Sequence, residues 1–320
     1  MASEKQSRPG LVDLQVNGFA GIDFNSELLT PDDVCSVCRQ LRRESVVAFL
    51  PTLITNTPDV LEKLIKTIIN TPAEEGAEIL GIHLEGPFIS PMPGARGAHP
   101  EEWIREPCLD EVRKYQDLAQ GKIRLITLSP EWPDSHRFIE RLCEMGIRVA
   151  IGHTLATSEQ IREAVQAGAT LATHLGNGIP AQLARHPNPI WSQLAEDRLW
   201  ISAIGDGFHL PQEVFAVFEK VKKEKMLLVS DSTQFAGMTP GRYCSHIGGD
   251  VVLSQDGKLA MADEPQLLAG SAMSLRKMID RLAENGWLSF ETAWEMGSMR
   301  PWQFLGETRP LEMVHATVFR

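Results

Sequence analysis

The chain has 320 residues, of which 43% are hydrophobic and 23% are charged, a composition typical of a globular protein with one large or two ordinary domains. The formal net charge of -11 argues against non-specific nucleic-acid binding and against docking on anionic membranes. The longest apolar runs are far shorter than a membrane helix requires, and the polar start, MASEKQSRPG, is unlike a signal segment.

Five cysteines, an odd number, are scattered through the chain. This pattern indicates reduced thiols rather than a disulfide framework, so we expect a cytoplasmic protein. Cys35 and Cys38 form a CxxC pair inside a helix-type segment, without a second pair elsewhere. We therefore interpret them as helix-packing residues and not as a zinc knuckle.

Apolar strand-like runs alternate with amphipathic helical patterns along the chain. The predicted strands span residues 11–16, 46–53, 78–85, 123–130, 148–154, 169–175, 199–207 and 226–232. The predicted helices between and after them span residues 31–44, 58–70, 108–119, 134–146, 158–168, 191–197 and 211–225. Eight such alternations indicate parallel strands with crossover helices, and the count favours an α/β fold of the closed (β/α)8, TIM-like type.

The pattern changes after residue 240. The segment YCSHIGGDVVLSQDGKLAMAD (243–263) predicts a hairpin with its turn at Asp256-Gly257, and two helices follow near 271–285 and 289–299. We expect a single barrel domain over 1–320, with barrel strands at about 11–232 and the hairpin and C-terminal helices at about 240–300.

Polar residues end most of the predicted strands, and the carboxyl ends of barrel strands are where active sites form. These residues are Asp13, Gln15 and Asn17 on strand one, Glu85 on strand three, His153 on strand five, His174 on strand six, Asp206 and His209 after strand seven, and Asp231 on strand eight. Each alone has a structural explanation, such as a helix cap. Their common position at one mouth predicts a functional site.

Glu85, His153 and His174 offer two imidazoles and one carboxylate, the ligand set of a catalytic zinc with one position open to water. A cation would also compensate Glu85, whose carboxylate faces into packed protein. Iron, manganese or cobalt would bind the same ligands. His83 points the same way but lies about 6.6 Å deeper, so we expect a second-layer residue. Asp231 is the best candidate for the base that takes a proton from water.

With these residues placed, the sequence resembles the N-acetylglucosamine-6-phosphate deacetylases of the amidohydrolase superfamily. The matching segments occur in family order over about residues 9–306: PGLVDLQVNGFAG (9–21), GIHLEGPFIS (81–90), GAHP (97–100), IGHTLAT (151–157), THLGNGIPA (173–181), IGDGFHL (204–210), LLVSDSTQFAGM (227–238) and LAGSAMSL (268–275).

The resemblance implies roles for individual residues. Glu85, His153 and His174 would hold the metal, and Asp231 would serve first as general base and then as general acid. His99 would polarise the acetyl carbonyl. The implied substrate-binding residues are Ala98, His99, Asn177, Gly178, Arg185, His209, Ala269, Gly270 and Ser271. Arg185 and His209 would bind phosphate, and a homodimer is expected.

The sequence departs from the family pattern at three points. Gln15-Val16-Asn17 stands where many amidohydrolases have His-x-His, so we expect a single metal and a second-site or water-holding role for Gln15. The chain is too short at both ends for the family's small β-sandwich domain, so we expect that domain to be absent. Gly176 replaces an aromatic residue, which would open the phosphate side of the pocket.

The sequence therefore predicts a metal-dependent deacetylase that converts N-acetylglucosamine 6-phosphate to glucosamine 6-phosphate and acetate. Other substrates stay open, namely N-acetylgalactosamine 6-phosphate, an unphosphorylated N-acetyl sugar or an N-acyl amino acid. A more remote alternative is a non-catalytic sugar-phosphate binding protein.

Overall fold

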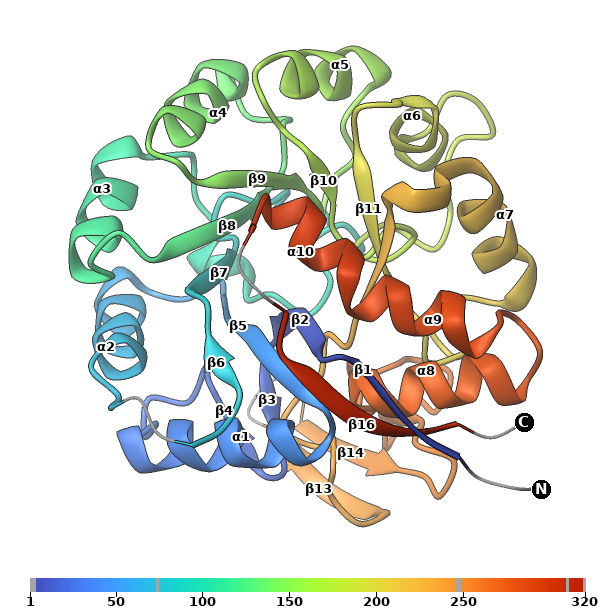
Figure 1. Cartoon of the computed structure of the whole chain (residues 1–320). Coiled ribbons are helices and arrows are strands. Elements are labelled where there is room, and N and C mark those ends of the chain that lie inside the picture. Colours follow the sequence, from blue (N-terminus) through green and yellow to red (C-terminus); the bar gives the residue numbers. More distant parts are fainter. Residues whose placement is uncertain (1–3, 73–74, 246–248, 309–310, 319–320) are drawn as a thin grey trace.

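Eight parallel strands form a nearly closed barrel with helices outside it (Figure 1). The computed structural model describes residues 4–72, 75–245, 249–308 and 311–318. The barrel strands, in spatial order, are β2 (Leu11–Val16), β5 (Val46–Ile54), β7 (Ile82–Glu85), β8 (Ile123–Leu128), β9 (Arg148–Ile151), β10 (Leu171–Ala172), β11 (Trp200–Ile204) and β12 (Met226–Val229). A parallel bridge between Val16 and Ser232 closes the ring. The predicted (β/α)8 class is confirmed.

Seven helices follow the predicted strand–helix rhythm. They are α1 (Pro31–Arg43), α2 (Pro58–Ile69), α3 (Leu109–Leu118), α4 (Ser135–Glu144), α5 (Ser158–Gln166), α6 (Pro189–Ala195) and α7 (Gln212–Lys222). Capping side chains set several starts: Thr30 and Thr157 form capping boxes with Asp33 and Gln160. No helix within the described ranges has the length and apolar character needed to cross a membrane.

The N-terminal ends of the barrel strands are covered by elements from both chain ends (Figure 1). Helices α8 (Leu275–Glu284), α9 (Phe290–Gly297) and α10 (Met299–Leu305) follow one another, where the sequence predicted only two helices. Ser298, with φ -126° and ψ -78°, separates α9 from α10. Trp302, Phe304 and Leu305 of α10 join the apolar cluster inside the barrel, so α10 closes this end.

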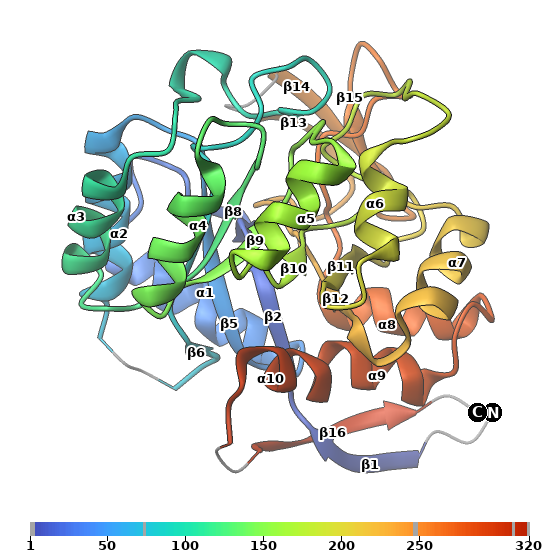
Figure 2. The same cartoon turned by 90° about the horizontal axis from the view of Figure 1, so that it is seen from above.

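A two-stranded antiparallel sheet joins β1 (Glu4–Pro9) to β16 (Met313–Val318) beneath α10 (Figure 2). Neither strand was among those predicted from the sequence, and the segment EKQSRP of β1 lacks the apolar alternation that indicates a strand.

The opposite end of the barrel carries the long loops and a small sheet (Figure 2). This sheet contains β13 (Gly241–Ser245), β14 (Gly249–Leu253) and β15 (Leu259–Met261). The predicted turn at Asp256-Gly257 joins β14 to β15, and β13 adds a third strand that the hairpin prediction lacked. Residues 246–248 of the predicted hairpin lie outside the described residues. The remaining strands are short. β3 (Gly18–Phe19) pairs with β4 (Ile22–Asp23), and β6 (Glu78–Ile79) pairs with β5.

Candidate active site

Three of the predicted site residues have left-handed backbone conformations at the ends of barrel strands. The φ angles are 49° for His153, 29° for His174 and 47° for Asp231. Residues other than glycine rarely adopt this region, and where it occurs at strand ends it re-aims side chains at some energetic cost. The turn at His174 also explains why β10 ends at Ala172 rather than at the predicted residue 175.

The carboxylate of Glu85 lies at the centre of the site and is buried. Its Oε1 atom is 2.9 Å from Nε2 of His174, 3.2 Å from Nε2 of His153 and 2.9 Å from Nε2 of Gln15. Burial opposes ionisation, but the close contacts with the two histidines outweigh it and hold the pKa of Glu85 well below its ordinary value. Gln15 thus donates its amide to the carboxylate, a contact that the sequence analysis did not foresee.

The geometry around His153 tests whether these residues fit a metal ion. Its Nδ1 lies 2.9 Å from the carbonyl oxygen of Ala95, and because a carbonyl only accepts, Nδ1 carries the proton. In a neutral ring the lone pair of Nε2 then faces Oε1 of Glu85, a repulsive arrangement unless a cation lies between them. Ligands about 2.1 Å from a tetrahedral zinc lie about 3.4 Å apart. The 3.2 Å between Nε2 of His153 and Oε1 of Glu85 is close to this spacing, and a divalent cation between them would remove the repulsion.

His99 lies in the same cluster. Ligand atoms of Glu85, His99 and His153 all lie within 4.8 Å of one another, so distance alone would include His99 among the metal ligands. However, Nδ1 of His99 accepts a hydrogen bond from the backbone N–H of Thr55, at 3.4 Å. Burial lowers the pKa of His99 to about 3. The ring is therefore neutral with its proton on Nε2, which suits a hydrogen-bond donor and not a metal ligand.

Asp231 is positioned by one contact with β2 and one with the residue that follows β2. Its backbone N–H donates to the Gln15 carbonyl at 2.9 Å, and Nδ2 of Asn17 donates to its Oδ1 at 2.7 Å. Burial, assisted by the negative charge of Glu85, raises the pKa of Asp231 to about 6. A carboxylate with that pKa accepts and returns a proton near neutral pH.

A polar layer inside the barrel lies below these groups. His83 is buried, with Nδ1 3.2 Å from the Leu14 carbonyl and Nε2 2.8 Å from the Thr127 hydroxyl. This agrees with the predicted second-layer position. Asp13 is also buried there and accepts from the backbone N–H of Ser230 at 3.1 Å, and burial raises its pKa to about 7.

The other predicted binding residues surround this centre at different depths. Asp206 accepts from Nδ1 of His209 at 2.7 Å, which fixes the orientation of that ring. Asn177 and Gly178 follow β10, and a Cβ on Gly178 would lie only 2.8 Å from Nδ1 of His153. The segment Ala269, Gly270 and Ser271 runs beside Ser232 and Thr233, next to Asp231.

Ala98 and Arg185 are exposed. The side chain of Arg185 makes no hydrogen bond or ion pair with any residue that the structure describes, so this conformation does not bring it to the centre.

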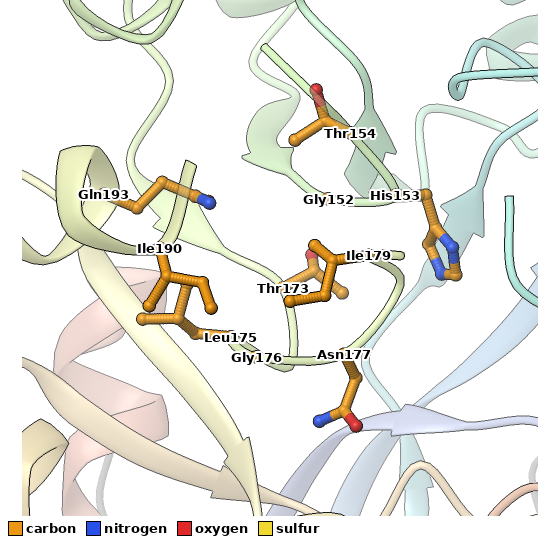
Figure 3. A pocket seen from close by; sticks show the side chains of 10 residues that line it. All are labelled: Gly152, His153, Thr154, Thr173, Leu175, Gly176, Asn177, Ile179, Ile190 and Gln193. Atoms are coloured by element: carbon orange, nitrogen blue, oxygen red, sulfur yellow. The ribbon is translucent and has the colours of Figure 1, made fainter. Parts of the chain in front are cut away.

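Gly176 lines a small cavity beside His153, between the ends of β9 and β10 and helix α6 (Figure 3). Its φ is 95°, and a Cβ there would lie 2.9 Å from Cδ2 of Leu210. The backbone conformation and this contact therefore favour a glycine, whereas the sequence suggested only a wider pocket at this position.

Two supporting residues were missed in the sequence. Thr55 follows β5 and contacts His99. Glu131 follows β8, and its Oε2 accepts from the Ser129 and Thr154 hydroxyls and from the Leu155 N–H, which ties down the turn after His153. Both are polar residues that follow predicted strands, the same signal that identified the other site residues.

Known proteins with a similar sequence share one kind of activity. The chain is 33% identical over 314 residues to the N-acetylglucosamine-6-phosphate deacetylase of Mus musculus, covering 93% of this chain and 74% of that protein. It is 34% identical over 275 residues to the Bacillus subtilis (strain 168) protein of the same name, covering 84% and 67%. The N-acetylgalactosamine-6-phosphate deacetylase of Escherichia coli O157:H7 is 31% identical over 300 residues, covering 93% and 78%. No protein-family model matches the chain.

Solved structures agree with the sequence comparison. A mutant N-acetyl-D-glucosamine-6-phosphate deacetylase from Mycobacterium smegmatis, in complex with N-acetyl-D-glucosamine-6-phosphate, superposes with a TM-score of 0.84 at 27% identity, covering 94% of this chain and 78% of that one. The Thermotoga maritima N-acetylglucosamine-6-phosphate deacetylase gives a TM-score of 0.79 at 26% identity, with 94% and 79% covered.

Proposed function

The chain belongs to the N-acetylglucosamine-6-phosphate deacetylase family, and we propose that it hydrolyses the acetamide of N-acetylglucosamine 6-phosphate to glucosamine 6-phosphate and acetate. The observation that carries this proposal is the meeting of Glu85, His153 and His174 at one end of the barrel. Asp231 and His99 lie beside this group.

Glu85, His153 and His174 would hold the metal. A divalent cation held there would supply Lewis acidity toward the acetyl carbonyl and would lower the pKa of water in the site. Zinc suits two imidazoles and a carboxylate, and iron, manganese or cobalt are further candidates. The Gln15 amide holds the carboxylate of Glu85 in place, a supporting role that we propose in place of water binding.

Asp231 would carry the proton through the reaction. As the carboxylate it accepts a proton from the attacking water, and as the acid it delivers that proton to the amine nitrogen. An amine is a poor leaving group without this delivery, so one residue acts in both halves. Nε2–H of His99 would donate to the acetyl oxygen as negative charge develops on it.

The sugar and phosphate would lie above this centre. Asn177 and Gly178 flank His153, and Asp206 orients His209 toward the substrate. Ala98 and the segment 269–271 would form the wall near the acetamide. Because Arg185 is exposed, we propose that it binds phosphate only after its loop, or its side chain, moves inward.

N-acetylgalactosamine 6-phosphate is a second candidate substrate. The chain is 31% identical to a deacetylase named for that sugar, close to its identity with the glucosamine-type relatives. The two sugars differ in the configuration of one hydroxyl, which the metal and Asp231 do not contact in this mechanism.

The cellular compartment and the binding partners of the protein follow from the same proposal. We place it in the cytoplasm, where its sugar-phosphate substrate would be retained, and all five cysteines are free thiols, as that compartment favours. Its partners would be the small-molecule substrate and a second copy of the chain.

Acetate release tests the proposal directly. The purified zinc-loaded protein is assayed with N-acetylglucosamine 6-phosphate, N-acetylgalactosamine 6-phosphate, unphosphorylated N-acetylglucosamine and an N-acetylated amino acid. We expect the highest kcat/KM for N-acetylglucosamine 6-phosphate. A higher value for the galactosamine compound would favour the second candidate, and no acetate from any of the four would overturn the deacetylase proposal.

A further inference from the structure

Thr55, at the end of β5, holds the ring of His99. Both residues are buried. The hydroxyl of Thr55 lies 2.8 Å from Nδ1 of His99, and the backbone N–H of Thr55 donates to the same nitrogen at 3.4 Å. The two residues are 44 positions apart in sequence, so this contact exists only in the folded barrel.

These two contacts select one tautomer of the neutral ring. If Nδ1 of His99 carried the proton, it would face the backbone N–H of Thr55, and two donors would oppose each other. With the proton on Nε2, Nδ1 accepts from both the backbone N–H and the hydroxyl of Thr55. The Nε2–H then points toward the centre of the site, where it lies 3.9 Å from Oε2 of Glu85.

The neighbouring His153 is held in the opposite way. Its Nδ1 donates to the carbonyl oxygen of Ala95, which leaves the lone pair on Nε2. The rings of His99 and His153 are 4.5 Å apart between centroids. His99 therefore presents a donor to the site, set by Thr55. His153 presents an acceptor, set by the Ala95 carbonyl.

The surroundings of Thr55 leave its hydroxyl little freedom. A Cβ on Gly86 would lie 2.2 Å from the Thr55 hydroxyl oxygen, so only a glycine at this position leaves room for it. Arg105 donates to the carbonyl oxygens of Asn56, next to Thr55, and of Trp103, at 2.9 and 2.7 Å. Its guanidinium is also paired with Glu111. This network fixes the turn that presents Thr55.

We propose that Thr55 is a positioning residue that holds His99 as the Nε2–H tautomer, so that the ring donates to the acetyl oxygen of the substrate. This inference rests on the proposed deacetylase function for its catalytic consequence. The tautomer itself is a property of the protein without substrate and is tested separately.

The tautomer is measured by nitrogen-15 NMR of histidine side chains in the zinc-loaded and in the metal-stripped protein, with the His99 signals assigned from a His99→Gln variant. We expect Nε2 of His99 to be protonated and Nδ1 unprotonated in both. Thr55→Val keeps the shape and the backbone N–H but removes the 2.8 Å hydroxyl contact, so we expect the Nε2–H form to lose part of its population to the Nδ1–H form. Thr55→Ser should restore the Nε2–H form.

Kinetics give the second measurement. Thr55→Val should lower kcat roughly tenfold, less than the 10²–10³-fold for removing a complete oxyanion donor, with KM within about twofold, and Thr55→Ser should recover most of the loss. Thr170→Val is the matched control, because the buried Thr170 hydroxyl has no partner among the described residues, and its kcat should stay near that of the wild type.

Two results would overturn the assignment. One is a wild-type spectrum with the proton on Nδ1 of His99, which needs no variant to fold. The other is a Thr55→Val protein that keeps both the Nε2–H form and the wild-type kcat. An inactive wild-type protein with the expected tautomer would overturn the deacetylase proposal and leave the positioning by Thr55 supported.

Discussion

The two ends of the barrel are filled by different kinds of side chain. At the N-terminal ends of the strands, Trp302, Phe304 and Leu305 of α10 pack into an apolar cluster. At the carboxyl ends, the buried groups are carboxylates and imidazoles, and one oxygen of Glu85 contacts Gln15, His153 and His174.

Because of this difference, one end of the barrel mainly stabilises the fold and the other carries the reactive groups. Apolar packing stabilises in proportion to the area it buries, whereas buried ionisable groups cost free energy unless partners compensate them. The left-handed backbone at His153, His174 and Asp231 adds strain at the same end. Substitutions at the closed end should therefore change unfolding, and substitutions at the open end should change turnover.

The largest effect should come from Asp231→Asn at the open end. Asparagine cannot accept the proton from water, so we expect kcat to fall by about 10³-fold, in the range of general acid–base catalysis. Metal content should persist, because Asp231 is not among the proposed ligands. Asp110→Asn, on the exposed face of α3, is the control. Near-normal acetate release from the Asp231 variant would refute the assigned base.

Trp302→Ala tests the closed end. The side chain is 6% exposed, and truncating a buried tryptophan costs about 3–5 kcal/mol of unfolding free energy. We expect that loss in urea denaturation, with kcat/KM within about twofold in the folded protein. Trp191→Ala on α6 is the control, because that side chain is 51% exposed. Lost activity with unchanged stability would remove the proposed division between the two ends.

Asp13→Asn tests the layer between the ends. Because the folded pKa of Asp13 is about 7, above the ordinary 3.9, its contribution to stability is fully present below about pH 4 and is lost as pH rises to about 7. Over that interval the wild type should lose up to about 4 kcal/mol relative to the variant, at 1.36 kcal/mol per pKa unit. Unfolding of the metal-stripped proteins between pH 4 and pH 8 measures this, and parallel profiles would contradict it.

Arg185→Ala should have the smallest effect, because the side chain is exposed. We expect KM for the phosphorylated substrate to rise severalfold, an effect of about 1 kcal/mol, with little change for unphosphorylated N-acetylglucosamine. Arg113→Ala on α3 should leave both values unchanged. An equal rise for both substrates would show that Arg185 does not bind the phosphate.

Many of the features that distinguish the two ends of the barrel could be predicted from the sequence. Buried parallel strands are continuous apolar runs, so their number and order could be counted, and polar residues such as Glu85 and His174 stood out where those runs end. The closed end was less accessible. Strand β1 is polar, and α10 begins at Met299, where the helix predicted over 289–299 was expected to end.

The features that the sequence could not predict are contacts between residues that lie far apart in the chain. That the Gln15 amide donates to Glu85, 70 positions away, depends on how β2 and β7 are placed in the barrel. The pairing of Thr55 with His99 likewise needs the loop after β7 to fold back over β5. Residue type at a strand end indicates which chemistry is present, but the partner that sets its proton or its charge comes from tertiary structure.

Calorimetric titration of the metal-stripped protein with zinc tests most directly whether Glu85, His153 and His174 hold one ion. We predict one zinc bound per wild-type chain, and an affinity at least about 100-fold weaker after Glu85→Ala. Zinc binding that is absent in the wild type, or equally tight in the Glu85→Ala protein, would contradict this account of the site.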